Sequence, residues 1–198
     1  MATTAVFAEI LIVGLEAAAW VSLLILDVFG QGWIDPAKLK GWETLVTLLV
    51  VALAYVLGIL IDRVADTMWK QAGRLASSLW DPKPKSDKDE PSYSEMRVKI
   101  LALGETALAA FLEYQRSRLR VARGTVVNLI AIIPMGAIYL DDRTNVGGRE
   151  IAWYVGLTSG ALLLSVYAAA RIKKAGDDRV QDAFYLVLDK AAGDTADS

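Results

Sequence analysis

Residues 7 to 30 read FAEILIVGLEAAAWVSLLILDVFG, and this stretch decides the fold class. It is long and apolar enough to cross a bilayer as one helix, since about 20 apolar residues suffice. It nevertheless carries three acids, Glu9, Glu16 and Asp27, spaced by 7 and 11 residues. At about 100° per residue the three carboxylates lie along one line of the helix. Because a charge facing lipid costs roughly 2.5 kcal/mol or more at mid-depth, we expect this line to face protein or water.

Three further stretches have a similar length and hydropathy. They are residues 43–61 (ETLVTLLVVALAYVLGILI), 124–140 (GTVVNLIAIIPMGAIYL) and 151–170 (IAWYVGLTSGALLLSVYAAA). At about 1.5 Å rise per residue even the shortest extends about 25 Å, against a hydrocarbon core of ~30 Å. Together with the first span, at about residues 6–29, they predict an all-α integral membrane protein with four transmembrane helices.

The composition excludes several classes of chemistry. The chain has no cysteine and no histidine, so disulfides, thiol nucleophiles, histidine acid–base catalysis and Cys/His zinc sites are absent. No phosphate-loop, dinucleotide-binding or zinc-protease motif occurs either. Asp62 and Asp66 could together hold a divalent ion, but charged residues flanking a span more often fix its position. We therefore expect no enzyme, no cofactor and no metal.

The basic residues are distributed unevenly. The central connection, residues 62–123, holds twelve of the 21, whereas the two short connections hold two each. The positive-inside rule then places this segment and both termini in the cytoplasm, and we expect a bacterial inner-membrane protein. With 23 acids nearly balancing the bases, nothing indicates nucleic-acid binding.

Four parts make up the expected organisation. They are a first transmembrane hairpin (1–61), a cytoplasmic helical hairpin (62–123) that extends spans two and three and has an exposed tip at 81–92, a second transmembrane hairpin (124–170), and a cytoplasmic amphipathic helix and tail (171–198). Leucines at helical spacing mark the hairpin: Leu101, Leu108, Leu112 and Leu119. In the tail, Val180, Phe184 and Leu188 recur every four residues and predict a short amphipathic helix. The apolar faces of the hairpin either pack on each other or on neighbouring subunits, which we favour, or dock a cytoplasmic partner.

Basic side chains cluster where two spans meet the cytoplasm. They are Arg116, Arg118, Arg120 and Arg123 before the third span, and Arg171, Lys173 and Lys174 after the fourth. We expect them to fix the topology and to contact anionic lipid headgroups, each contributing about 1 kcal/mol near the surface. On a helix Arg118 points away from the other three arginines of its cluster.

Glu16 lies near mid-membrane and poses the main question. No Lys or Arg occupies the interior of the other spans, so no charged partner is visible. We expect its carboxyl group to be protonated, to line water, or to be hydrogen-bonded to a polar group such as Asn128, Thr158 or Ser159.

Small residues at four-residue spacing predict close helix contacts, because they let two backbones approach. They are Gly14 and Ala18, Ala54 and Gly58, and Gly156 and Gly160. Pro134 is expected to loosen the third span, because it cannot donate to the carbonyl of Ile130.

Two functions remain open. The first is a homo-oligomer that conducts ions or perturbs the bilayer, with the carboxylate line of span one facing its axis. The alternative is an anchor or scaffold subunit that recruits a cytoplasmic partner through the helical hairpin. The four-span architecture resembles that of small bacterial membrane effectors of phage defence, in architecture alone.

Overall fold

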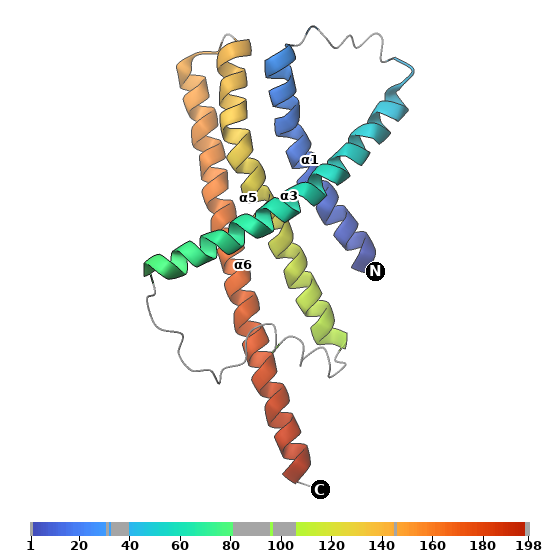
Figure 1. Ribbon diagram of the computed structural model, residues 1–198, viewed down its shortest axis with the longest axis vertical. Coiled ribbons are helices and arrows are strands. Elements are labelled where there is room, and N and C mark those ends of the chain that lie inside the picture. The colour runs from blue at the N-terminus through green and yellow to red at the C-terminus, as the bar shows by residue number, and fades with distance from the viewer. Residues whose placement is uncertain are drawn as a thin grey trace.

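The computed structural model describes residues 2–30, 32, 40–80, 96, 106–144 and 146–196. Within them the fold consists of α1 (Ala2–Phe29), α3 (Glu43–Trp80), α5 (Thr106–Arg143) and α6 (Gly148–Ala196) (Figure 1). Each of these four helices contains a segment long and apolar enough to cross a membrane. The prediction of an all-helical chain with four such helices is confirmed. The expected tip at 81–92 and Leu101 lie outside the described residues.

Glycines and turns set the helix ends. α1 ends at Phe29 because Gly30 has a φ of +75°, a conformation that glycine adopts without strain, and its N–H bonds the carbonyl of Leu26 at 2.9 Å. At the start of α6 the carbonyl of Gly147 accepts the N–H of Glu150 at 3.0 Å. The Glu150 carboxylate lies in the first turn of α6, where it complements the helix dipole.

α5 is the central helix and packs on all three others, while α1 also packs on α3. α1 and α5 run in one direction, and α3 and α6 run in the other (Figure 1). The ion pair of Glu9 with Arg120 marks one end of the shared α1–α5 interface, here called the Glu9 end. The pair of Asp27 with Arg143 marks the opposite, Asp27 end.

The core lies where α1, α3 and α5 meet, at Val13, Ala17 and Ile61. Outside these contacts the surface is strongly apolar: Leu48 and Leu157 are each 69 % exposed, and Leu164 is 70 % exposed. A water-soluble chain rarely leaves so much apolar surface uncovered, whereas lipid-facing helices do.

Three of the helices continue well beyond the apolar spans. α3 runs on past residue 61 to Trp80, and α5 is already helical at Thr106. The tail is a continuation of α6 up to Ala196, where a separate short helix was expected, because nothing between 171 and 196 breaks the helix. The proline in α5, Pro134, likewise lies inside one helix.

The apolar stripes at the Glu9 end pack against each other. Leu112 of α5 is buried against Val180 and Phe184 of α6, and Met96 packs on this cluster. One leucine of the predicted stripe, Leu112, is thus covered by side chains of α6, whereas the side chains of Leu108 and Leu188 lie outside the described residues.

Candidate functional site

α1 and α3 approach each other through glycine. A Cβ atom on Gly14 would lie 1.7 Å from the carbonyl oxygen of Ala54, and one on Gly58 would lie 2.0 Å from that of Ile10. Both distances are far below van der Waals contact, so only glycine permits this approach. Gly14 of the first small-residue pair therefore lies in one contact with Ala54 and Gly58 of the second.

A third glycine, Gly124 of α5, holds α1 from the other side. A Cβ there would lie 2.7 Å from the side chain of Val13. By contrast, a Cβ at Gly156 or Gly160 would meet nothing within 4 Å. The G-x-x-x-G pair of α6 thus has no role in the contacts of the described chain.

A buried polar cluster lies inside the bundle between α1 and α5, with Asn128 at its centre. The side-chain amide of Asn128 is fully buried and donates to the carbonyl of Val13 at 2.8 Å and to the carboxylate of Glu16 at 3.1 Å. Its oxygen accepts the indole N–H of Trp20 at 3.2 Å, and the hydroxyl of Thr125 donates to Glu16 at 3.0 Å. Glu16 is therefore hydrogen-bonded by two groups of α5.

The chemistry of these neighbours fixes which way the amide points. The indole of Trp20 can only donate, so it must face the amide oxygen, while the carbonyl of Val13 can only accept. Both amide hydrogens of Asn128 are then used, one by Val13 and one by Glu16. A leucine of similar volume would leave all three neighbours without this partner.

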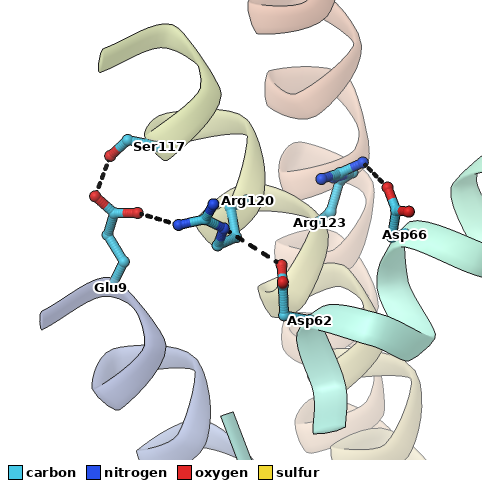
Figure 2. Close-up of polar contacts among 6 residues, drawn as sticks. All are labelled: Glu9, Asp62, Asp66, Ser117, Arg120 and Arg123. Atoms are coloured by element: carbon cyan, nitrogen blue, oxygen red, sulfur yellow. Dashed lines mark hydrogen bonds and ion pairs between the residues drawn. The ribbon is translucent and has the colours of Figure 1, made fainter. Parts of the chain in front are cut away.

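An ion-pair network ties three helices together at the Glu9 end (Figure 2). The guanidinium of Arg120 on α5 lies 3.2 Å from the carboxylate of Glu9 on α1 and 3.6 Å from that of Asp62 on α3. Ser117 donates a hydrogen bond to the second oxygen of Glu9. Glu9 is 8 % exposed, so its pairing takes place largely out of water. Arg120 thus lies between α1 and α3.

A second arginine extends the network along α3. Arg123 donates to the carboxylate of Asp66 at 3.0 Å (Figure 2). Lys70 pairs with the same carboxylate at 2.6 Å. Asp62 and Asp66 are therefore each paired with arginine. No cluster of three or more metal-ligating side chains occurs in the described part of the chain.

The third acid of α1, Asp27, has an ionic partner at the opposite end of the interface, although its buried Oδ1 accepts no hydrogen bond within the described chain. The guanidinium of Arg143 on α5 lies 3.8 Å from the carboxylate of Asp27 and also donates to the backbone carbonyl of Asp27. Together with the contacts of Glu9 and Glu16, this pair gives each acid of α1 a partner on α5. The aligned carboxylates form a polar seam between two helices of one chain.

The four arginines before the third span divide into two pairs. Arg120 and Arg123 point into the bundle, where they pair with acids. Arg116 and Arg118 are exposed, and the guanidinium of Arg118 lies 5.5 Å from the centre of the Tyr114 ring. Arg120 and Arg123 therefore join helices to one another, and the predicted roles of the cluster in topology and in contact with lipid headgroups stay predictions.

Several residues of α5 that contact the acids of α1 were not predicted from the sequence. Ser117, Thr125 and Arg143 each contact an acid of α1 and were not predicted, whereas Arg120 and Asn128 were among the predicted site residues. The partners follow the order of the acids along the chain, as two helices that run in the same direction require.

A groove lies on the exposed side of the Glu9 end, between α5 and α6, with a volume of about 640 Å³. Phe111 and Tyr114 provide its aromatic wall, and the guanidinium of Arg179 lies 5.1 Å from the centre of the Phe111 ring. Its charged residues are four bases and one acid: Arg118, Arg171, Lys174, Arg179 and Asp178. We call it the α5–α6 groove.

No protein-family model matches the chain, and no curated protein and no solved structure matches it either.

Proposed function

We propose that the protein is a membrane anchor that recruits a cytoplasmic protein through an acidic segment. In this proposal the four helices cross the membrane with both termini and the Glu9 end in the cytoplasm. The positive-inside distribution of the bases supports this orientation. The helical regions beyond the spans then form the platform that the partner binds.

The α5–α6 groove is the observation that carries this proposal. It carries three more bases than acids and two aromatic rings on a surface backed by the packed cluster around Leu112. Arg118 and Arg179 each lie over an aromatic ring, so their guanidinium groups are held in place. Arginine in a fixed orientation recognises carboxylates through paired hydrogen bonds, which favours an acidic peptide as the ligand.

The contacts of α1 give independent support. Glu9, Glu16 and Asp27 each have a partner on α5 within the chain. Each carboxylate of α1 thus faces a group of α5, which fits a helix that packs inside one chain, as an anchor requires.

Charge reversal in the groove tests the anchor function. Cells express either the wild-type protein or the double variant Arg118→Glu with Arg179→Glu. Proteins cross-linked to the wild type are identified, and their amount in the membrane fraction is then compared between the two kinds of cell. We expect the amount of the partner in the membrane fraction to fall at least fivefold. Arg116→Glu is the single-reversal control at the same end of the bundle, because Arg116 is exposed on α5 and does not line the groove.

A partner counts as evidence only if it responds to the groove substitutions and not to the control. Membrane insertion of each variant is checked by its level in the membrane fraction. Equal recovery of every captured protein with both variants would exclude the α5–α6 groove as the recruiting surface.

A second candidate is the homo-oligomeric assembly that conducts ions or perturbs the membrane. Ionisable groups at three depths of the α1–α5 interface favour it, because a polar seam through an apolar span is a common feature of ion pathways. In this case the purified protein in planar bilayers gives cation-selective currents, and Glu16→Gln reduces them. Electrically silent bilayers containing folded protein would argue against conduction.

A further inference from the structure

A second groove, which shares Lys174 and Asp178 with the α5–α6 groove, opens between α3, α5 and α6 and has a volume of about 670 Å³. This size lies within the ~300–1,000 Å³ typical of ligand-binding clefts. One part of its lining is apolar and comes from all three helices: Met68, Trp69, Val126, Val127, Ile130 and Val166. We call it the three-helix groove.

The other part of the lining is charged and has an order along α6. Val166 and Ala170 come first, then the bases Lys173 and Lys174, and then the acids Asp177 and Asp178. Each step is about four residues, or ~6 Å of helix rise. Arg123 of α5, directly before the apolar span of that helix, adds a third base.

We propose that the three-helix groove binds one aminophospholipid, a lipid with a phosphate and a primary ammonium in its headgroup. From the membrane outward such a lipid presents acyl chains, then phosphate, then ammonium. The groove presents apolar residues, then bases, then acids. This sequence of complementary groups favours a zwitterionic headgroup over a purely anionic one, which Asp177 and Asp178 would repel.

Arg123 supports a phosphate at the middle position. One of its terminal nitrogens donates to Asp66, but its Nε–H is buried and lacks a hydrogen-bond partner in the described chain. A phosphate oxygen is an acceptor that arginine binds well. Trp69 is amphipathic, and such rings favour the level of the headgroups.

The lipid site requires only that the helices cross a membrane, so it is tested without any protein partner. Purified protein is stripped of lipid and titrated in detergent with phosphatidylethanolamine, phosphatidylcholine or phosphatidylglycerol of identical acyl chains, and bound lipid is counted by native mass spectrometry. We expect phosphatidylethanolamine to bind at least tenfold more tightly than either other lipid.

Separate substitutions of the bases and of the acids that line the groove measure what each contributes to lipid binding. Lys173→Gln with Lys174→Gln weakens phosphatidylethanolamine binding at least fivefold, because the phosphate loses its cations. Asp177→Asn with Asp178→Asn shifts the preference toward phosphatidylglycerol. Single-charge controls of the same sign are Arg171→Gln and Asp182→Asn, on the same helix but outside this groove.

Filling the apolar part provides a test that leaves the charges unchanged. A Cβ on Gly73, which lines the groove, would meet nothing within 4 Å, so Gly73→Leu has room for its side chain. It is expected to reduce binding of phosphatidylethanolamine at least fivefold, whereas Gly156→Leu on the far part of α6 leaves binding unchanged. Equal binding of the three lipids by wild type, or an unaltered order in the charge variants, would overturn the proposal.

Discussion

The amide of Asn128 and the carboxylate of Glu16 lie 3.1 Å apart across the α1–α5 interface. The acid nearest mid-membrane is thus held by a neutral amide and by a hydroxyl group, not by an opposite charge. In an apolar surrounding such a bond aligns two helices, because a slip in register would leave both polar groups without a partner.

Removing the amide is expected to destabilise the bundle. Asn128→Ala leaves Glu16 with one donor fewer and the indole of Trp20 without an acceptor, a loss of about 1–3 kcal/mol in the free energy of unfolding. Unfolding by titration with a denaturing detergent measures the change. Thr158→Ala is the control, since the hydroxyl of Thr158 bonds only carbonyls of its own helix. Equal losses in the two variants would contradict a special role for Asn128.

The pair of Glu9 and Arg120 is expected to show energetic coupling. Glu9→Gln and Arg120→Gln each leave the other charge largely buried, so the double variant loses less stability than the sum of the two single variants. We expect a coupling energy of about 1–3 kcal/mol in a double-mutant cycle. The exposed Arg116 gives the reference: Arg116→Gln adds independently to Glu9→Gln, and coupling of similar size there would refute the specific pair.

Two glycine substitutions separate contact positions from open ones. Gly58→Ala places a methyl group against the backbone of α1 at Ile10, so α1 and α3 must move apart. The expected loss exceeds about 2 kcal/mol, because backbone cannot rotate out of the way as a side chain can. Gly156→Ala and Gly160→Ala have free space and are expected to change stability by no more than ~0.5 kcal/mol. Cross-linking between cysteines introduced on α1 and α3 would report the separation directly.

The contact of α6 with α5 gives a fourth prediction. The hydroxyl of Tyr154 donates to the carbonyl of Ile132 at 2.8 Å, and a Cβ on Gly136 would lie 2.0 Å from this hydroxyl. Tyr154→Phe is expected to lose about 0.5–1.5 kcal/mol, and Gly136→Ala to lose more because the whole ring must move. Both values come from the same detergent titration. Tyr167→Phe, on an exposed ring of the same helix, is expected to leave stability unchanged.

The sequence predicts the four helices and the shared direction of the acids, because both follow from hydropathy and from a fixed angle per residue. It also predicts Asn128 as one of the groups able to hydrogen-bond Glu16, and in the structure the amide of Asn128 donates to the Glu16 carboxylate. Thr158, another group considered, bonds its own helix instead. Periodicity gives the face of each helix, but only packing decides which faces meet.

The arginines illustrate this limit. Their number near a span predicts an orientation in the membrane, and the same residues equally suit lipid contact or internal pairing. Arg120 and Arg123 pair internally because glycine contacts bring α1 and α3 close to α5 and carry Glu9, Asp62 and Asp66 with them. The small-residue spacing marks Gly14, Ala54 and Gly58 as contact positions, but it does not say which helix each of them contacts.

The parallel pairing of α1 with α5 also has a consequence for how the chain is made. Glu16 leaves the ribosome 109 residues before Thr125. At about 5–20 residues per second, roughly 5–20 s of translation separate the two. During that interval the first helix has an acid at mid-membrane and none of its α5 partners. Biogenesis thus includes an early stage in which α1 and α3 are already able to associate through Gly14 and Gly58. At this stage the α5 residues that donate hydrogen bonds to Glu16 have not yet been synthesised.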